Sequence, residues 1–194
     1  MRTLFFILSI LSTDPSFCSE DRTLIPGIRI GPVSNKSSEA ELIKRLGAKQ
    51  VKSSTSYLAG STEGEEGPVT ILFPDDVKKE IIVVWKDSSL KNNPELAYTS
   101  GSHWLTEDGL SIGVTLEKLE EINGRSFKFM PFNSDVAGNI IDWMGGKLSN
   151  WAKTGSFVTL RNTNGDDSAT KEHLSSDIAA RKLKPVVSQI RIKF

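Results

Sequence analysis

The fold of this chain is decided by the stretch Gly109-Leu-Ser-Ile-Gly-Val-Thr-Leu-Glu-Lys-Leu-Glu-Glu-Ile-Asn-Gly124. Thr115 is a suitable N-cap for a helix, because its hydroxyl can accept a hydrogen bond from a free N–H of the first turn. The apolar residues that follow recur on one helix face: Leu116, Leu119 and Ile122. Gly124 suits the left-handed residue that ends a helix. The stretch therefore predicts a strand-like lead-in and a short helix over 115–122.

An earlier stretch has the same order of features. Gly27-Ile-Arg-Ile-Gly31 is again strand-like, and either Ser37 or Ser38 can cap a helix. The apolar stripe and the stop of this helix are Leu42, Ile43, Leu46 and Gly47. The pattern predicts a helix over about 38–46 and indicates an internal duplication.

Strands are predicted by runs rich in β-branched and aromatic residues. These runs are 51–58, 69–73, 80–85, part of 96–105, 126–132, 138–144, 155–162 and a closing strand from Val187 to Phe194. Pro74-Asp75-Asp76 supplies turn residues for a hairpin. Gly145-Gly146 is typical of a tight primed turn between two strands.

These elements predict an α+β fold. We expect two tandem units, each a short helix followed by an antiparallel β-sheet. The units would span about 25–105 and 109–194, within a single domain over 19–194.

The composition excludes some classes of partner. The 194 residues include 24 basic and 24 acidic side chains, so the formal net charge is zero. A neutral chain produces no long-range field that attracts polyanions, and we therefore expect no nucleic-acid partner. Apolar residues make up 38% of the chain, which is enough for an ordinary core.

Residues 1–18 have the form of a secretory signal peptide. Arg2 provides the positive start, and Leu4 to Leu11 is an eight-residue apolar run, followed by Pro15. A membrane span needs roughly 20 apolar residues, so we expect an exported, periplasmic or secreted protein without a transmembrane segment. The only cysteine, Cys18, leaves a lipoprotein as the alternative, with this residue as the lipid-modified start. In both cases the folded part forms no internal disulfide.

The residues Gly27-Ile-Arg-Ile-Gly31 and Gly109-Leu-Ser-Ile-Gly-Val-Thr-Leu-Glu-Lys-Leu resemble the opening of a known repeat. That repeat is shared by the β-lactamase inhibitor protein and the small outer-membrane assembly lipoproteins. The chain from about 25 to 194 also resembles uncharacterised secreted bacterial proteins with such tandem repeats. In those families two units side by side present a broad concave sheet to a protein partner. The resemblance implies a binding function, although Pro32 departs from the pattern and a shared fold does not establish function.

No set of catalytic residues stands out. His103 and His173 are the only histidines, and neither has a metal-ligand spacing, so we expect no metal and no cofactor. His103 beside Glu107 or Asp108 gives the alternative of a periplasmic hydrolase, since such a histidine can act as a general base. The stretch Asn162-Thr-Asn-Gly-Asp-Asp167 alternates oxygen donors as calcium loops do, but its glycine is misplaced and a solvated turn is the simpler interpretation.

Aromatic residues are the remaining candidates. Trp143 follows Ile140-Ile141-Asp142, and Trp151 lies among Ser, Asn, Ala and Lys. If both tryptophans lie on the exposed face of the sheet, they have the character of rigid interface anchors. The alternative is that they pack in the core. We therefore expect a monomeric, non-catalytic protein-binding or envelope-associated module with Trp143, Trp151 and Phe132 as binding residues. A glycan or peptidoglycan binder is a further alternative.

Overall fold

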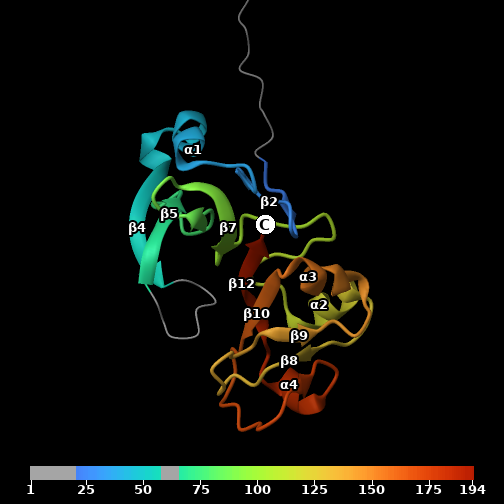
Figure 1. The fold of residues 1–194 in the computed structure, drawn as a ribbon. Helices are drawn as coiled ribbons and strands as arrows, with labels where there is room; N and C mark the ends of the chain where they lie inside the picture. The colour runs from blue at the N-terminus through green and yellow to red at the C-terminus, as the bar shows by residue number, and fades with distance from the viewer. Residues whose placement is uncertain (1–20, 58–65) are drawn as a thin grey trace, which may run out of the picture.

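A six-stranded antiparallel sheet forms the centre of the computed structural model, which describes residues 21–57 and 66–194 (Figure 1). Its strand order is β10-β12-β7-β6-β5-β4. The strands are β4 (Val51–Tyr57), β5 (Glu66–Leu72), β6 (Ile81–Asp87), β7 (Asn92–Thr99), β10 (Phe157–Arg161) and β12 (Val186–Lys193). The C-terminal strand β12 pairs with both β7 and β10, so it joins the first and second halves of the chain in one sheet. The expected signal peptide lies outside the described residues.

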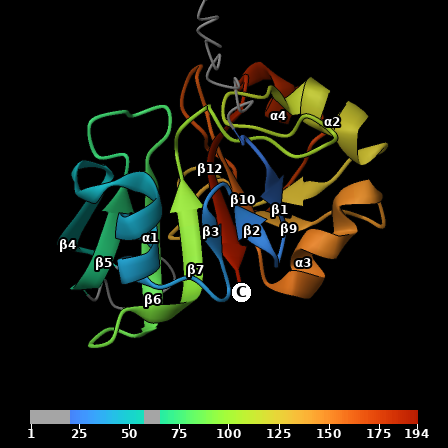
Figure 2. The ribbon, with the colours of Figure 1, turned by 90° about the horizontal axis from the view of Figure 1, so that it is seen from above.

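Smaller elements surround this sheet (Figure 2). Two three-stranded sheets have the orders β1-β2-β3 and β11-β8-β9. Their strands are β1 (Leu24–Ile25), β2 (Arg29–Ile30), β3 (Val33–Ser34), β8 (Lys128–Phe129), β9 (Ile140–Asp142) and β11 (His173–Leu174). The helices are α1 (Glu39–Leu46), α2 (Leu116–Asn123), α3 (Asn150–Thr154) and α4 (Ile178–Lys182), with 3-10 turns η1 (Ala48–Gln50) and η2 (Lys147–Ser149). The α+β prediction is confirmed.

Both predicted helices form where their capping residues indicate. Ser38 accepts from the amide of Glu41, and the Glu41 side chain accepts from the amide of Ser38, which completes a capping box at the start of α1. Thr115 accepts from the amide of Lys118 at the start of α2. Gly124 ends α2 in the left-handed conformation, with φ of 79°. Local sequence signals are therefore sufficient for these two elements.

The strands of the first half lie where they are predicted, but β5 and β7 both begin earlier than expected. Strand β5 starts at Glu66 and not at Val69. Strand β7 shows the second difference. It starts at Asn92 and includes Pro94, which pairs with Trp85 where the register shifts by one residue. Proline has no N–H to donate to a neighbouring strand, so this irregularity is where the sheet can accommodate it. The hairpin from β5 to β6 turns at the predicted Pro74-Asp75-Asp76.

The two faces of the sheet have different surroundings. Helix α1 covers one face, where Leu42 joins the main core with Leu72 and Val83 (Figure 2). The opposite face carries a separate cluster centred on the buried side chains of Val69, Val84 and Tyr98. Because the main core continues into the second half through β12, the described residues share one principal core.

The second half differs from the predictions in two respects. The expected strands over 126–132 and 138–144 shorten to β8 and β9, and Gly145-Gly146 joins β9 to η2 instead of closing a hairpin. Asn123 explains the different role of Gly145-Gly146, because its amide oxygen accepts a hydrogen bond from the backbone N–H of Leu148, just after these glycines. A methyl group on Gly146 would overlap the Asn123 amide, so this glycine permits a close approach and does not serve a primed turn.

The internal duplication stays a prediction. Gly31 lies directly against the ring of Trp104, whereas its counterpart Gly113 faces open space, so the two glycines have different roles. Likewise α1 packs beside β4, and α2 packs beside η2. No helix in the described part of the chain is long and apolar enough to span a membrane.

Candidate functional site

The two tryptophans proposed as anchors are buried. Trp143 follows β9 and is 4% exposed, with its ring 5.3 Å from that of Phe127. Trp151 is 2% exposed, because residues 150–154 form α3 and turn its side chain into the core. The expectation that both tryptophans lie on an exposed sheet face is therefore wrong.

Phe132 is half-buried and lies at the far end of the same row of aromatic rings, which runs from Trp143 through Phe127 and Phe129. Its ring lies 5.6 Å from that of Phe129 and 6.5 Å from that of His173. Its backbone N–H donates to Asp167 Oδ2 at 2.8 Å. Phe132 thus helps to hold the 162–172 segment, whereas Trp143 packs on Phe127.

Trp143 nevertheless lines an apolar pocket of about 300 Å³. The lining residues are Val136, Asn139, Ile140, Ile141, Trp143, Ala152, Ser156, Phe157 and Val158. Three apolar members of this set are exposed: Val136 by 48%, Ile141 by 49% and Phe157 by 43%. The pocket therefore combines a buried aromatic wall with an apolar rim that meets solvent.

Local pairing explains why a pocket forms here. Asn139 and Thr159 make an isolated antiparallel bridge between the β9 and β10 segments, and Thr159 Oγ1 donates to Asn139 Oδ1 at 2.7 Å. The ladder does not continue from this bridge to Ile141 and Phe157, which line the pocket instead. Strand β10 is also an end strand of the six-stranded sheet.

The polar side chains that line the pocket are those of Asn139 and Ser156. Ser156 Oγ accepts from the amide of Lys193 at 3.2 Å. A pocket with mostly apolar walls and few polar groups is the usual form of a ligand site.

Arg191 lies next to this pocket, on the sheet face opposite α1. Its partners in the two neighbouring strands are Phe157 in β10 and Tyr98 in β7. The guanidinium carbon lies 5.9 Å from the centre of the Phe157 ring. Burial lowers the pKa of Arg191, and its Nε is buried without a hydrogen-bond partner in the described residues.

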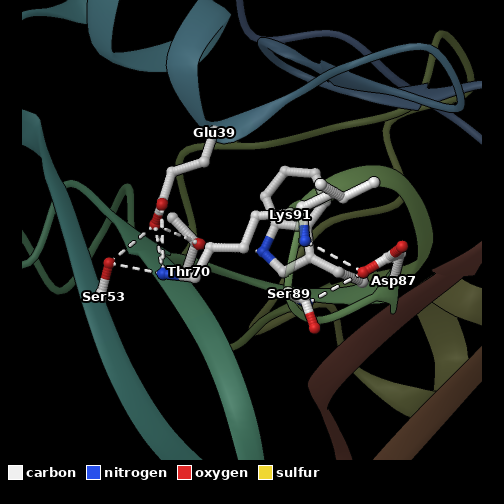
Figure 3. A network of polar contacts seen from close by, with 8 residues as sticks. Glu39, Ser53, Thr70, Asp87, Ser89 and Lys91 are labelled. Atoms are coloured by element: carbon white, nitrogen blue, oxygen red, sulfur yellow. Dashed lines mark hydrogen bonds and ion pairs between the residues drawn. The ribbon is translucent and has the colours of Figure 1, made fainter.

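A polar network that contains the ionisable side chains of Glu39 and Lys91 lies beneath α1, apart from the pocket (Figure 3). Glu39 Oε1 accepts from Ser53 Oγ and Thr70 Oγ1, both at 2.8 Å, and from Lys91 Nζ at 3.1 Å. Lys91 Nζ also donates to Ser53 Oγ at 2.7 Å. Burial tends to raise the pKa of Glu39, but the hydrogen bonds from Thr70, Ser53 and Lys91 outweigh it and lower the pKa.

This network fastens α1 to the sheet. A serine next to a lysine is one arrangement of a nucleophile and its base, which requires a neutral lysine amine. Here Lys91 forms an ion pair with Glu39, and Glu39 also accepts from Ser53. The tight turn that presents Lys91 is held by Asp87, whose Oδ1 accepts the amides of Ser89 and Leu90 (Figure 3). The contacts favour a structural role.

The two histidines lie in unrelated surroundings. The ring of His103 packs edge-on against Trp104, with centroids 4.7 Å apart, while Glu107 and Asp108 are exposed in the next turn. His173 Nε2 lies 2.8 Å from Asp167 Oδ2, and both side chains are largely buried. The hydrolase based on His103 stays a prediction, and no contact described here favours it.

Asp167 is the last residue of the stretch compared with calcium loops, and both of its carboxylate oxygens form hydrogen bonds with protein groups. Its carboxylate accepts from the amides of Phe132 and Ala169 in addition to its contact with His173. Burial tends to raise the pKa of Asp167, but these hydrogen bonds outweigh it and lower the pKa. Within residues 21–57 and 66–194, no group of three or more His, Cys, Asp or Glu residues is placed to hold a metal ion.

No family model and no curated protein sequence matches this chain. A similar solved structure is that of the uncharacterized protein YfeY from Escherichia coli, with 10% sequence identity and a TM-score of 0.49. The alignment covers 88% of this chain and 99% of that chain.

Proposed function

We propose that this protein is a non-catalytic binding module that recognises a protein partner through the pocket between β9, α3 and β10. The observation that carries this proposal is the exposed apolar rim of Val136, Ile141 and Phe157 around a pocket of about 300 Å³. Single exposed apolar side chains are common on protein surfaces, but several that gather at the mouth of one apolar pocket indicate a binding site.

The composition of the site favours a protein as its partner. Protein interfaces combine an apolar centre with nearby arginine and aromatic residues. Here the rim residue Phe157 contacts the Arg191 guanidinium across paired strands. An apolar side chain of the partner would enter the pocket and contact Trp143 and Ile140. The resemblance to repeats that present a sheet to a protein partner agrees with this proposal.

The two alternative functions, a glycan or peptidoglycan binder and a periplasmic hydrolase, have less support from the described contacts. Trp143 and Trp151 are 4% and 2% exposed, so neither indole offers a platform for stacking on a sugar. A hydrolase needs a base held against a reacting group. The ring of His103 packs edge-on against Trp104, and its backbone carbonyl accepts from Arg22 Nε.

We also propose that the protein acts outside the cytoplasm. The support is the signal-like pattern of residues 1–18, and Cys18 gives a lipoprotein as the alternative form. Mass spectrometry of the protein isolated from its native host tests this directly. A mature start at residue 19, or a lipid-modified Cys18, supports export. A chain that begins at Met1 and stays in the cytoplasmic fraction contradicts it.

Site-specific photo-crosslinking in the native host tests the binding function. A benzophenone amino acid replaces Ile141 at the pocket rim, and a second version carries the same group in place of Ile178, which is 74% exposed on α4. We expect a discrete protein adduct from position 141 that is absent from position 178. The adduct should disappear when Phe157→Ser is added, because this change removes part of the rim.

The design separates specific from unspecific capture. Equal adducts at both positions, or an adduct at position 141 that persists with Phe157→Ser, would show that the pocket does not select the partner. Absence of any adduct at position 141 would also count against the proposal. Thermal unfolding of each variant verifies that the fold is retained.

A further inference from the structure

We propose that Arg191 is the anion-recognition residue of this same site, and that it binds a side-chain carboxylate of the partner segment whose apolar side chain fills the pocket. This inference rests on the proposed function. It specifies the partner as an extended segment with an apolar residue and an acidic residue two positions apart.

The first support is the position of Arg191 in the sheet. Strand β12 lies between β10 and β7, and the side chain of Arg191 shares a face with Phe157 and Tyr98. Phe157 is at the same time a rim residue of the pocket. The guanidinium and the pocket are therefore separated by a single aromatic ring.

The second support is the unsatisfied state of the guanidinium. Its Nη2 lies 3.5 Å from Gln189 Oε1, at the limit of a hydrogen bond, and its Nε has no partner in the described residues. No described carboxylate forms an ion pair with Arg191. The Nε–H is one of the five N–H donors of the guanidinium, and a buried donor without a partner is costly.

The third support is the distance between the two parts of the site. In an extended segment, residues i and i+2 point to the same side and lie about 7 Å apart. The Phe157 ring and the Arg191 guanidinium carbon are 5.9 Å apart. A partner residue in the pocket therefore brings the residue two positions along toward Arg191. A carboxylate there can accept a bidentate pair of hydrogen bonds from a guanidinium.

Blocked tripeptides provide a direct test. The probes are acetyl-Phe-Ala-Glu-amide and its neutral isostere acetyl-Phe-Ala-Gln-amide, added to the protein labelled at isoleucine and valine methyl groups. Binding is followed by the NMR shifts of the methyls of Val136, Ile141 and Val158, which line the pocket. We expect the glutamate peptide to bind about tenfold more tightly than the glutamine peptide, because charge-assisted hydrogen bonds are about twice as strong as neutral ones.

Variants identify the residue responsible for the difference. In Arg191→Gln the two peptides should bind alike. Lys193→Gln is the matched control, because Lys193 is on the same strand two residues along and is exposed, and there the tenfold preference should persist. Arg191→Lys retains the charge without the planar fork, so it should keep only part of the preference. The comparison of the glutamate and glutamine peptides on the wild-type protein tests the proposal even if a variant at position 191 does not fold.

Each outcome has a separate meaning. Equal binding of both peptides to the wild type, with shifts at the pocket, overturns the role of Arg191 and leaves the proposed function intact. No shift at the pocket methyls with either peptide overturns both. A third probe, acetyl-Phe-Ala with a free carboxyl end, distinguishes the source of the anion. If it binds more tightly than the glutamate peptide, the carboxylate is a chain end and the proposed side-chain source is wrong.

Discussion

The guanidinium of Arg191 lies 5.9 Å from the centre of the Phe157 ring, across the pairing of β12 with β10. This relationship connects an apolar pocket at the end of the sheet with a half-buried positive charge on the sheet face. The two residues come from strands that are brought together only when the C-terminus closes the sheet. The binding surface therefore depends on the complete fold.

The pocket rim should be dispensable for stability and required for binding. Ile141→Asp places a charge on an exposed side chain, so the free energy of unfolding should change by no more than about 0.5 kcal/mol. Because position 141 is now occupied by aspartate, the benzophenone amino acid is placed at the rim residue Val136 in this variant, and its crosslink to the partner should be lost. Urea denaturation and crosslinking measure the two effects. Val77→Asp, at a side chain 79% exposed and outside the pocket, should leave both unchanged.

Gly146 should be one of the positions where a single methyl group is most harmful. Gly146→Ala places a methyl against the Asn123 amide, which bonds to Leu148, Arg125 and Trp143. We expect a loss of about 2–4 kcal/mol in the free energy of unfolding, since a buried hydrogen-bond network is displaced.

A double-mutant cycle assigns this cost to the contact between the two residues. Asn123→Ala alone should destabilise, and adding Gly146→Ala to it should cost much less than Gly146→Ala does in the wild type. Equal costs in both backgrounds would show that the Asn123 amide is not what the methyl displaces.

The buried hydroxyl of Thr70 should contribute to the attachment of α1. It donates to Glu39 and accepts from Trp85 Nε1, so Thr70→Val leaves the buried indole N–H of Trp85 without this acceptor and removes one of the hydrogen bonds to Glu39. The expected loss is about 1–3 kcal/mol in the free energy of unfolding. Thr55→Val, at an exposed site on β4, is the control and should be close to neutral. A neutral Thr70→Val would contradict the role given to this network.

The contribution of Glu39 should depend on pH. Its pKa in the folded protein is lower than its ordinary value of 4.5, so the folded state favours the ionised form. The stabilisation is then present above the unfolded-state pKa and is lost as the pH falls through the folded-state pKa. The difference in unfolding free energy between wild type and Glu39→Gln should be largest near pH 7 and shrink below about pH 4.5. A constant difference from pH 7 to pH 3 would exclude this explanation.

Asp167 should hold the 162–172 segment against the rest of the second half. Asp167→Asn weakens its hydrogen bonds with His173, Phe132 and Ala169, and we expect a loss of about 1–3 kcal/mol. The amides of Phe132 and Ala169 should exchange their hydrogens faster. The adjacent exposed Asp166 supplies the control, because Asp166→Asn should alter neither the stability nor the exchange. Unchanged exchange in Asp167→Asn would show that the segment is held by other contacts.

Much of the fold follows from local sequence signals. Ser38, Thr115 and Gly124 mark the helix ends correctly, because capping depends on residues within one turn. The first-half strands follow from their β-branched runs. The role of Gly145-Gly146 does not, because Asn123, which decides it, approaches from a different part of the chain.

The candidate site is predicted only in part. Trp143 is identified by its residue type and lines the pocket, but its polar sequence neighbours wrongly indicate exposure. Ile141 and Phe157 give no signal, since single apolar residues are common on protein surfaces. Alternation places Arg191 on the polar face of β12, but its contact with Phe157 depends on the register between distant strands.

Methyl NMR of the labelled protein with acetyl-Phe-amide tests the pocket most directly, because this probe has an apolar side chain and no carboxylate. Small apolar ligands bind weakly, so we expect a dissociation constant on the order of 1–10 mM. The account predicts saturable shifts at Val136, Ile140, Ile141 and Val158, and none at Val77 or Ile178. Shifts that do not saturate, or that are equal at Val77 and Ile178, would contradict a binding function for this pocket.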